Sequence, residues 1–143
     1  MINSRKPEDL HPRVLEKAKA FIDDCHTQGI DLIVTSTYRD FESQNALYAQ
    51  GRTAPGKKVT NAKGGQSFHN FRVAFDIVPM RAGKPVWNTS GADGDLWRRV
   101  GGIGKAHGLE WGGDFKSIKD MPHFQYTNGL TLADFNSGKT LNA

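Results

Sequence analysis

The feature of this sequence that most constrains its fold is a single carboxylate inside an apolar run. Asp76 is the only charged residue between Val73 and Val78, and the run predicts a largely buried strand. A bare buried carboxylate costs several kcal/mol, so it must be ion-paired, hydrogen-bonded or bound to a metal. Arg72, directly before the run, would pair with it in a purely structural role. The chain must therefore fold so that the Asp76 strand meets a partner for this group.

Two histidines offer a different partner. His69 precedes Asp76 by seven residues, and His123 comes much later in the chain. Two imidazole nitrogens and a carboxylate oxygen make three zinc ligands, and a catalytic zinc leaves its fourth position to water. Asp120, three residues before His123, suits a general base held beside a ligand. A lone histidine among aromatic residues is more often structural. On residue chemistry alone, a zinc hydrolase and a salt-bridged strand are equally good interpretations.

The remaining pattern predicts a mixture of helices and short strands. Apolar residues at helical spacing predict helices over 14–25 and 96–103, with Gly29 and Gly108 as stops. Asp40 is placed as the N-cap of another helix that ends near Gly51, and a short helix is expected after residue 128. Strands are predicted at 32–34, 73–78, 85–87 and 121–126. The last of these would lie beside the strand that bears Asp76.

Two segments next to these elements are expected to border a cleft. Residues 52–66 hold glycine, proline, lysine and asparagine, which predicts a long mobile loop leading to the first histidine and shaping substrate access. Arg39 lies where a strand passes into a helix, a position from which its side chain can reach a cleft. The alternative for Arg39 is a surface ion pair with Asp40 or Glu42.

Composition narrows the class of protein. At 143 residues with 37% hydrophobic residues, the chain is expected to form one domain over 1–143. No segment approaches the roughly 20 apolar residues that span a bilayer, and residues 1–9 lack the apolar core of a secretory signal. The single cysteine, Cys25, is expected to be a small buried hydrophobe. A net charge of +4 suits an anionic surface, but the basic residues are scattered and do not interleave with aromatic ones, so nucleic acid is not an expected partner.

Several motifs together resemble a known enzyme family. Ser67-x-His69, Ala74-x-Asp76 and Asp120-x-x-His123-Phe124 resemble the zinc peptidases of family M15, which are related to D-alanyl-D-alanine carboxypeptidases and VanY-like peptidases. Thr35-Ser36-Thr37-Tyr38-Arg39 with the following Gln44, Leu47 and Tyr48, and the segment 111–115, match in the same order. The resemblance runs roughly from residue 32 to 124. Within the family, the chain looks most like the L-alanyl-D-glutamate endopeptidases that bacteriophages use as endolysins.

The resemblance implies a fold and a set of roles. The fold would be α+β, with a small, mostly antiparallel sheet, helices packed behind it and a zinc cleft on the open face. One Zn²⁺ per chain would be held by His69, Asp76 and His123, with Asp120 as the catalytic base. Arg39 would stabilise negative charge on the substrate carbonyl oxygen. Ser67 would either contact substrate or hold the loop through a backbone hydrogen bond.

The resemblance also implies a biological setting. The substrate would be the stem peptide of peptidoglycan, cleaved between L-alanine and D-glutamate, with cell lysis as the result. A monomer made in the host cytoplasm without a signal peptide would reach the periplasmic wall after the membrane is permeabilised. The alternatives are a D,D-carboxypeptidase, disfavoured by aspartate rather than glutamate at position 120, a non-catalytic wall-binding module, and a basic metal nuclease. One departure is Arg72, where the family usually has a glycine that serves a special backbone angle.

Overall fold

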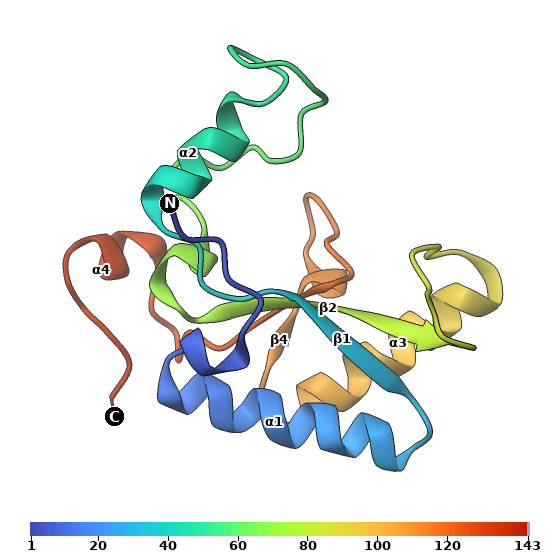
Figure 1. Ribbon diagram of the computed structural model, residues 1–143. Helices are drawn as coiled ribbons and strands as arrows, with labels where there is room; N and C mark the ends of the chain where they lie inside the picture. Colours follow the sequence, from blue (N-terminus) through green and yellow to red (C-terminus); the bar gives the residue numbers. More distant parts are fainter. Residues whose placement is uncertain (143) are drawn as a thin grey trace.

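A small antiparallel sheet forms the centre of the molecule (Figure 1). The computed structural model describes residues 1–142. The strands are β1 (Asp31–Ser36), β2 (Ala74–Arg81), β3 (Lys84–Pro85), β4 (Glu110–Trp111) and β5 (His123–Gln125). They follow the order β1-β2-β5-β4, with β3 paired to the end of β2. The α+β class with a mostly antiparallel sheet is thus confirmed.

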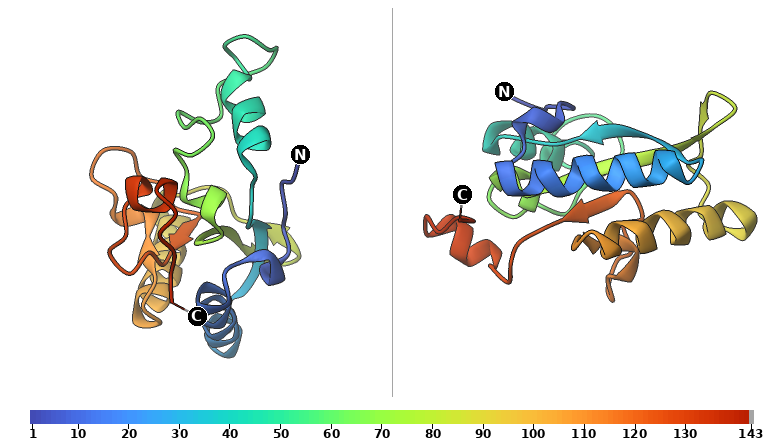
Figure 2. Two further views of the ribbon diagram at one scale, coloured as in Figure 1. Left: turned by 90° about the vertical axis from the view of Figure 1, so that its left-hand side faces the viewer. Right: turned by 90° about the horizontal axis from the view of Figure 1, so that it is seen from below.

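Two long helices pack side by side against one face of this sheet (Figure 2, right). They are α1 (Pro12–Thr27) and α3 (Gly91–Ala106), and two shorter helices are α2 (Phe41–Ala49) and α4 (Leu132–Asn136). Short 3₁₀ turns occur at η1 (Pro7–Asp9), η2 (Phe68–Phe71) and η3 (Gly112–Asp114). The predicted helices are confirmed, although α3 starts five residues before the first of its predicted apolar positions. The face of the sheet opposite α1 and α3 stays available for a site.

Aromatic packing holds α1 to the sheet. Phe21 of α1 lies with its ring centroid 4.7 Å from Phe124 and 6.2 Å from Phe75, and all three side chains are fully buried. On α3, glycines take the place of side chains, because a Cβ at Gly101 or Gly104 would overlap the Trp111 or Phe124 ring. The helix therefore approaches the sheet closely enough to seal the core. Cys25 lies in this core, as expected.

Strand β2 turns Asp76 away from the core. Phe75 and Ile77 are fully buried in the core, and alternation along the strand directs Asp76 to the opposite face. Asp76 pairs with His123 on β5 and, across an irregularity in the ladder, with Ser36 on β1. The prediction that the last strand lies beside the strand bearing Asp76 is confirmed. Three strands therefore meet at this one carboxylate.

The hairpin after β2 agrees with its prediction only in part. Ala82 and Gly83 form a two-residue turn with φ values of 50° and 77°, which is typical of tight hairpins. The return strand ends at Pro85, however, and Trp87 is 55% exposed outside any strand. The buried Trp97 indole donates to the carbonyl oxygens of Val86 and Asn88, at 3.1 and 3.0 Å. These bonds lead the chain out of the sheet and toward α3.

The segment 52–66 contains no helix or strand, as predicted, and α2 fastens it at several points. Arg52 donates to the carbonyl oxygens of Tyr48 and Thr60, at 2.7 and 3.0 Å. The Gln44 amide donates to the carbonyl oxygen of Ala62 at 2.8 Å. The expected mobility of this loop stays a prediction.

Two broader expectations concern membrane-spanning helices and the number of domains. Within residues 1–142, no helix combines the length and the apolar character needed to cross a bilayer. That residues 1–143 form a single domain stays a prediction, and Ala143 lies outside the described residues.

Candidate metal centre and active site

A capped turn presents His69. The Ser67 hydroxyl accepts a hydrogen bond from the His69 backbone N–H at 3.3 Å, and the Asn70 side chain accepts one from the Ser67 N–H, also at 3.3 Å. This reciprocal cap fixes the start of η2. The His69 Nδ1 donates to the buried carbonyl oxygen of Thr37 at 2.8 Å, so that Nε2 is the nitrogen that faces Asp76. Of the two roles expected for Ser67, its hydrogen bond corresponds to holding the loop.

His123 is oriented in the same manner from β5. Its Nε2 donates to Gln125 Oε1 at 2.7 Å, so that Nδ1 is the nitrogen that faces Asp76. Both residues are buried, with His123 8% and Gln125 5% exposed. Because side chains two apart on a strand share a face, the amide reaches the ring without distorting the backbone. Each histidine thus has one nitrogen that donates to a fixed acceptor and a second nitrogen that faces Asp76 and can bind a metal.

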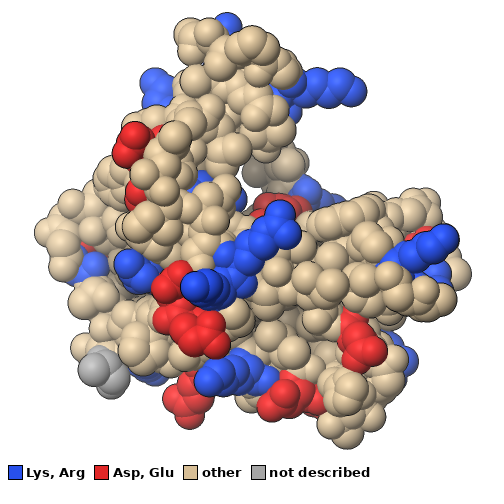
Figure 3. Space-filling model, viewed as in Figure 1, with Lys and Arg blue, Asp and Glu red and all other residues tan. Residues whose placement is uncertain are grey.

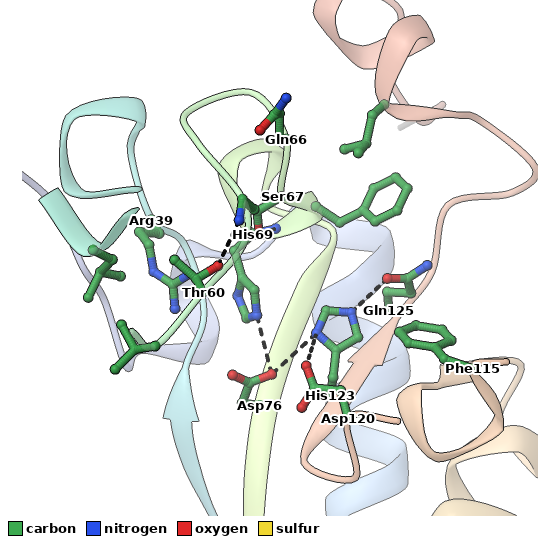
Figure 4. A pocket seen from close by; sticks show the side chains of 15 residues that line it. Arg39, Thr60, Gln66, Ser67, His69, Asp76, Phe115, Asp120, His123 and Gln125 are labelled. Carbon is green, nitrogen blue, oxygen red and sulfur yellow. Dashed lines mark hydrogen bonds and ion pairs between the residues drawn. The ribbon is translucent and has the colours of Figure 1, made fainter. Parts of the chain in front are cut away.

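The three candidate ligands converge on one point (Figure 4). Asp76 Oδ1 lies 3.2 Å from His69 Nε2 and 3.4 Å from His123 Nδ1. One donor atom from each residue lies within 4.8 Å of the other two. Two imidazole nitrogens and one carboxylate oxygen are the donor set of a three-ligand zinc site. The residues present therefore fit Zn²⁺.

The ion pair of Asp76 with Arg72 does not form. Arg72 lies with its guanidinium carbon 3.8 Å from the centroid of the Tyr38 ring and donates to the carbonyl oxygen of Asp9 at 2.8 Å. Asp76 instead faces two imidazoles. Burial raises the pKa of Asp76, but the charges and hydrogen bonds of His69 and His123 outweigh burial and hold that pKa well below its usual value. For His123, burial lowers the pKa, and the bond to Asp76 reverses this into a net rise.

Asp120 lies at the edge of this cluster. Its Oδ2 is 3.9 Å from His123 Nδ1, and its side chain is 52% exposed. The backbone fixes it on both sides, because its N–H donates to Gly112 at 2.9 Å and its carbonyl oxygen accepts from the His123 N–H at 3.1 Å. Burial raises the pKa of Asp120, although the nearby His123 acts to lower it. A carboxylate with raised proton affinity beside a metal site suits proton transfer.

Arg39 reaches the site from the segment between β1 and α2. Its guanidinium donates to Gln44 Oε1 at 2.9 Å and to Ser36 Oγ at 3.2 Å, whereas its buried Nε has no partner within the described chain. Burial lowers the pKa of Arg39, and the charges of Asp76 and Asp120 oppose this effect. Asp40 caps α2 instead of pairing with Arg39, so the surface ion pair is not what forms.

These side chains line one cavity of about 490 Å³, which we call the central cavity. It contains Arg39, Ser67, His69, Asp76, Asp120 and His123, together with residues of the loop 52–66. Figure 3 shows the surface hollowed beneath the projecting α2 region, with acidic and basic side chains interspersed around it. All the residues singled out from the sequence are therefore brought together.

Three residues of the site were not predicted as such. Thr37 and Gln125 orient the two histidines, and the fully buried Gln44 holds Arg39. A signal existed for Gln125, since it lies two positions after His123 on an expected strand. No sequence signal indicated that the backbone carbonyl of Thr37 is the acceptor for His69.

Comparison with known proteins places this site in a family. The profile of the D-alanyl-D-alanine carboxypeptidase family matches residues 60–126. The peptidoglycan L-alanyl-D-glutamate endopeptidase CwlK of Bacillus subtilis is 41% identical over 125 residues, covering 83% of this chain and 74% of CwlK. The L-alanyl-D-glutamate peptidase of Listeria phage A118 is 29% identical over 110 residues, covering 76% of this chain but only 35% of the phage protein.

Solved structures share the fold. The L-Ala D-Glu endopeptidase ChiX of Serratia marcescens superposes with a TM-score of 0.63 at 21% identity, over 90% of this chain and 86% of ChiX. VanYB in complex with D-alanine-D-alanine gives 0.61 at 17% identity, over 98% of this chain and 90% of VanYB. With the similarity to CwlK over most of both chains, these findings show that the chain is a peptidase of the D-alanyl-D-alanine carboxypeptidase family, M15.

Proposed function

We propose that this peptidase is a zinc-dependent endopeptidase that hydrolyses the L-alanyl-D-glutamate bond in the stem peptide of peptidoglycan. The observation that carries the proposal is the meeting of His69, Asp76 and His123 at one point, with Asp120 beside them. The names of the Bacillus and Listeria phage relatives support the choice of bond. We assign one Zn²⁺ per chain to the three ligands.

The proposed mechanism uses the groups that surround this point. Bound Zn²⁺ would lower the pKa of water from about 16 to about 7 and polarise the scissile carbonyl. Asp120 accepts the proton of the attacking water, since its carboxylate lies 3.9 Å from the ligand His123 and lines the same cavity as the three ligands. It then returns this proton to the leaving amine. Asp120 is therefore the general base first and the general acid afterwards.

Arg39 is assigned to the developing negative charge on the substrate carbonyl oxygen. Gln44 and Ser36 hold two of its nitrogens, and its Nε stays without a partner. A cation already held in place needs no rearrangement as the charge develops. We assign Ser67 to the substrate-facing wall of the cavity, where its cap on η2 positions His69.

One experiment tests the reaction directly. Purified peptidoglycan is incubated with the zinc-loaded protein, and newly formed amino termini are identified. We expect new amino-terminal D-glutamate, which is absent when the Asp120→Asn variant is used. Release of free D-alanine without new D-glutamate termini would establish the D,D-carboxypeptidase alternative. No release by a protein that still binds peptidoglycan would establish the wall-binding module, and cleavage of DNA instead of peptidoglycan the metal nuclease.

Zinc content checks the ligands separately. We expect about one zinc per chain in the wild-type protein and most of it lost in His69→Ala and His123→Ala. Unchanged zinc in both variants would refute the ligand assignment. This measurement does not depend on knowing the substrate.

We further propose that the enzyme serves as a phage endolysin, an assignment supported by the Listeria phage relative. It would act as a monomer on the periplasmic wall after membrane permeabilisation, without a nucleic-acid partner. Added to cells with a permeabilised outer membrane, it should lower their turbidity, and its mass in solution should equal that of one chain. Intact cell density in the presence of active enzyme would contradict the lytic role.

A further inference from the structure

A second cavity opens directly from the central one. We call it the side cavity; its volume is about 850 Å³. It shares most of its wall with the central cavity, including Thr60, Gln66, Phe115 and Asp120. The loop 52–66 lines both cavities, and so does the segment 115–120. Figure 4 shows Gln66 above the metal ligands and Phe115 beside His123. A peptide bound at the metal centre can therefore continue into the side cavity.

The two cavities differ in the cation that each contains. Arg39 is the only lysine or arginine that lines the central cavity, and Lys119 is the only one that lines the side cavity. Among the residues that line both cavities, Asp120 is the only ionisable one. Lys119 forms no ion pair within the described chain, and its ammonium donates to the carbonyl oxygen of Gly113 at 3.1 Å. This hydrogen bond closes the segment 113–119 onto itself and holds the ammonium group of Lys119, the residue directly before Asp120.

The position of Asp120 tells which half of the substrate enters the side cavity. In the proposed mechanism Asp120 hands a proton to the leaving amine, whereas Arg39 faces the carbonyl oxygen. The side cavity is lined by Asp120 but not by Arg39 or the three metal ligands. It is therefore the half of the groove that receives the residue on the amine side of the cleaved bond.

The chemistry of that residue matches Lys119. A glutamyl residue has two carboxyl groups, and only one of them can continue the peptide, so the other stays free and negative. Beside the carboxylate of Asp120 this charge would be repelled unless a cation neutralised it. We propose that Lys119 binds the free carboxylate of the residue on the amine side and selects a glutamyl residue there over its amidated form. This inference rests on the proposed function and adds a specificity residue to it.

Two synthetic peptides test the proposal. Both carry the L-alanyl-D-glutamyl bond, but in one the free carboxylate is replaced by a carboxamide. Zinc-loaded wild-type protein should cleave the carboxylate peptide with a kcat/KM about threefold to tenfold higher, the range for an exposed charge-assisted contact. The preference should shrink as salt is raised, because an exposed pair is screened. Lys119→Met should lower kcat/KM for the carboxylate peptide alone and so abolish the preference.

Lys116→Met is the matched control, because it removes the same charge from the same segment at a residue that lines neither cavity. It should keep the preference, and all variants should keep their zinc. If Lys119→Met slows both peptides equally, the residue only holds the loop through Gly113 and the proposal is wrong. It is also wrong if the wild-type protein shows no preference. Cleavage of neither peptide, with release of terminal D-alanine from peptidoglycan, would overturn the proposed function and this inference with it.

Discussion

Replacing Gln125 by leucine should weaken zinc binding without touching a ligand. The amide oxygen of Gln125 is the acceptor for His123 Nε2 at 2.7 Å, and both side chains are at least nine-tenths buried. Leucine fills a similar volume but leaves that N–H without a partner. The loss of a buried acceptor costs about 1–3 kcal/mol. It also frees the proton to move to Nδ1, the nitrogen assigned to the metal.

This cost sets the size of the effect. An energy of about 1.4 kcal/mol is a tenfold change in an equilibrium constant. Removing such an outer partner of a metal-binding histidine usually lowers the metal affinity by about tenfold to a hundredfold, which corresponds to about 1.4–2.8 kcal/mol. Gln125→Glu is the matched control, because it keeps an acceptor at the same distance. It should bind zinc as tightly as the wild-type protein or more tightly.

The assay is competition for Zn²⁺ with a chromophoric chelator at fixed pH, with circular dichroism to confirm that each variant is folded. Wild-type affinity in Gln125→Leu would refute the reasoning. Equal weakening in Gln125→Leu and Gln125→Glu would mean that packing at this position matters and the acceptor does not.

Four further outcomes follow from the structure. Arg39→Ala should keep its zinc but lower kcat by about a hundredfold or more, the usual cost of losing a donor to the carbonyl oxygen; normal turnover with lower stability would show a structural role instead. Asp120→Asn should also keep its zinc while activity falls by about a hundredfold to ten-thousandfold, and activity surviving at neutral pH would contradict the mechanism. Burial raises the pKa of the Cys25 thiol to about 12, so at pH 8 a thiol reagent should label the unfolded chain quickly and the folded one only slowly; rapid labelling of folded protein would show that the helix α1 opens. Arg72→Gly should leave cleavage unchanged and shift the melting temperature little, because relief of about 1 kcal/mol of backbone strain offsets a similar loss of cation–π attraction; a large loss of activity would show that Arg72 takes part in the groove.

The fold could be predicted wherever one element carries its own periodic signal. Helix α1 and β2 are of this kind, because helical spacing from Val14 to Cys25 and an unbroken apolar run around Asp76 each specify a buried face. The end of β3 could not be predicted, since it depends on Trp97. The indole N–H of Trp97 donates to carbonyl oxygens eleven and nine residues earlier in the chain. Distant partners of this sort override local strand propensity.

The candidate site also has a part that local sequence patterns predict and a part that depends on distant contacts. The types and spacing of the candidate ligands could be predicted, because zinc accepts few side chains and a buried Asp76 needed a partner, although an ion pair with Arg72 was an equally good interpretation of that charge. The groups that orient the ligands were harder to predict, since His69 donates to a main-chain carbonyl oxygen, which every residue type has. The partnerless Nε of Arg39 could not be foreseen either, because it results from how Gln44 and Ser36 occupy the rest of the guanidinium.

Arg72 shows why a departure from a family pattern need not alter chemistry. Its φ of 64° and ψ of 22° are left-handed, the conformation that a glycine would adopt freely, so the backbone angle expected of the family residue is kept. For arginine this costs about 1–2 kcal/mol. The side chain stacks on Tyr38 and bonds to Asp9, and it lines neither the central nor the side cavity. Because the angle and not the side chain turns the chain from η2 into β2, His69 and Asp76 keep their relative placement, and the contacts of Arg72 with Tyr38 and Asp9 offset the strain away from the metal ligands.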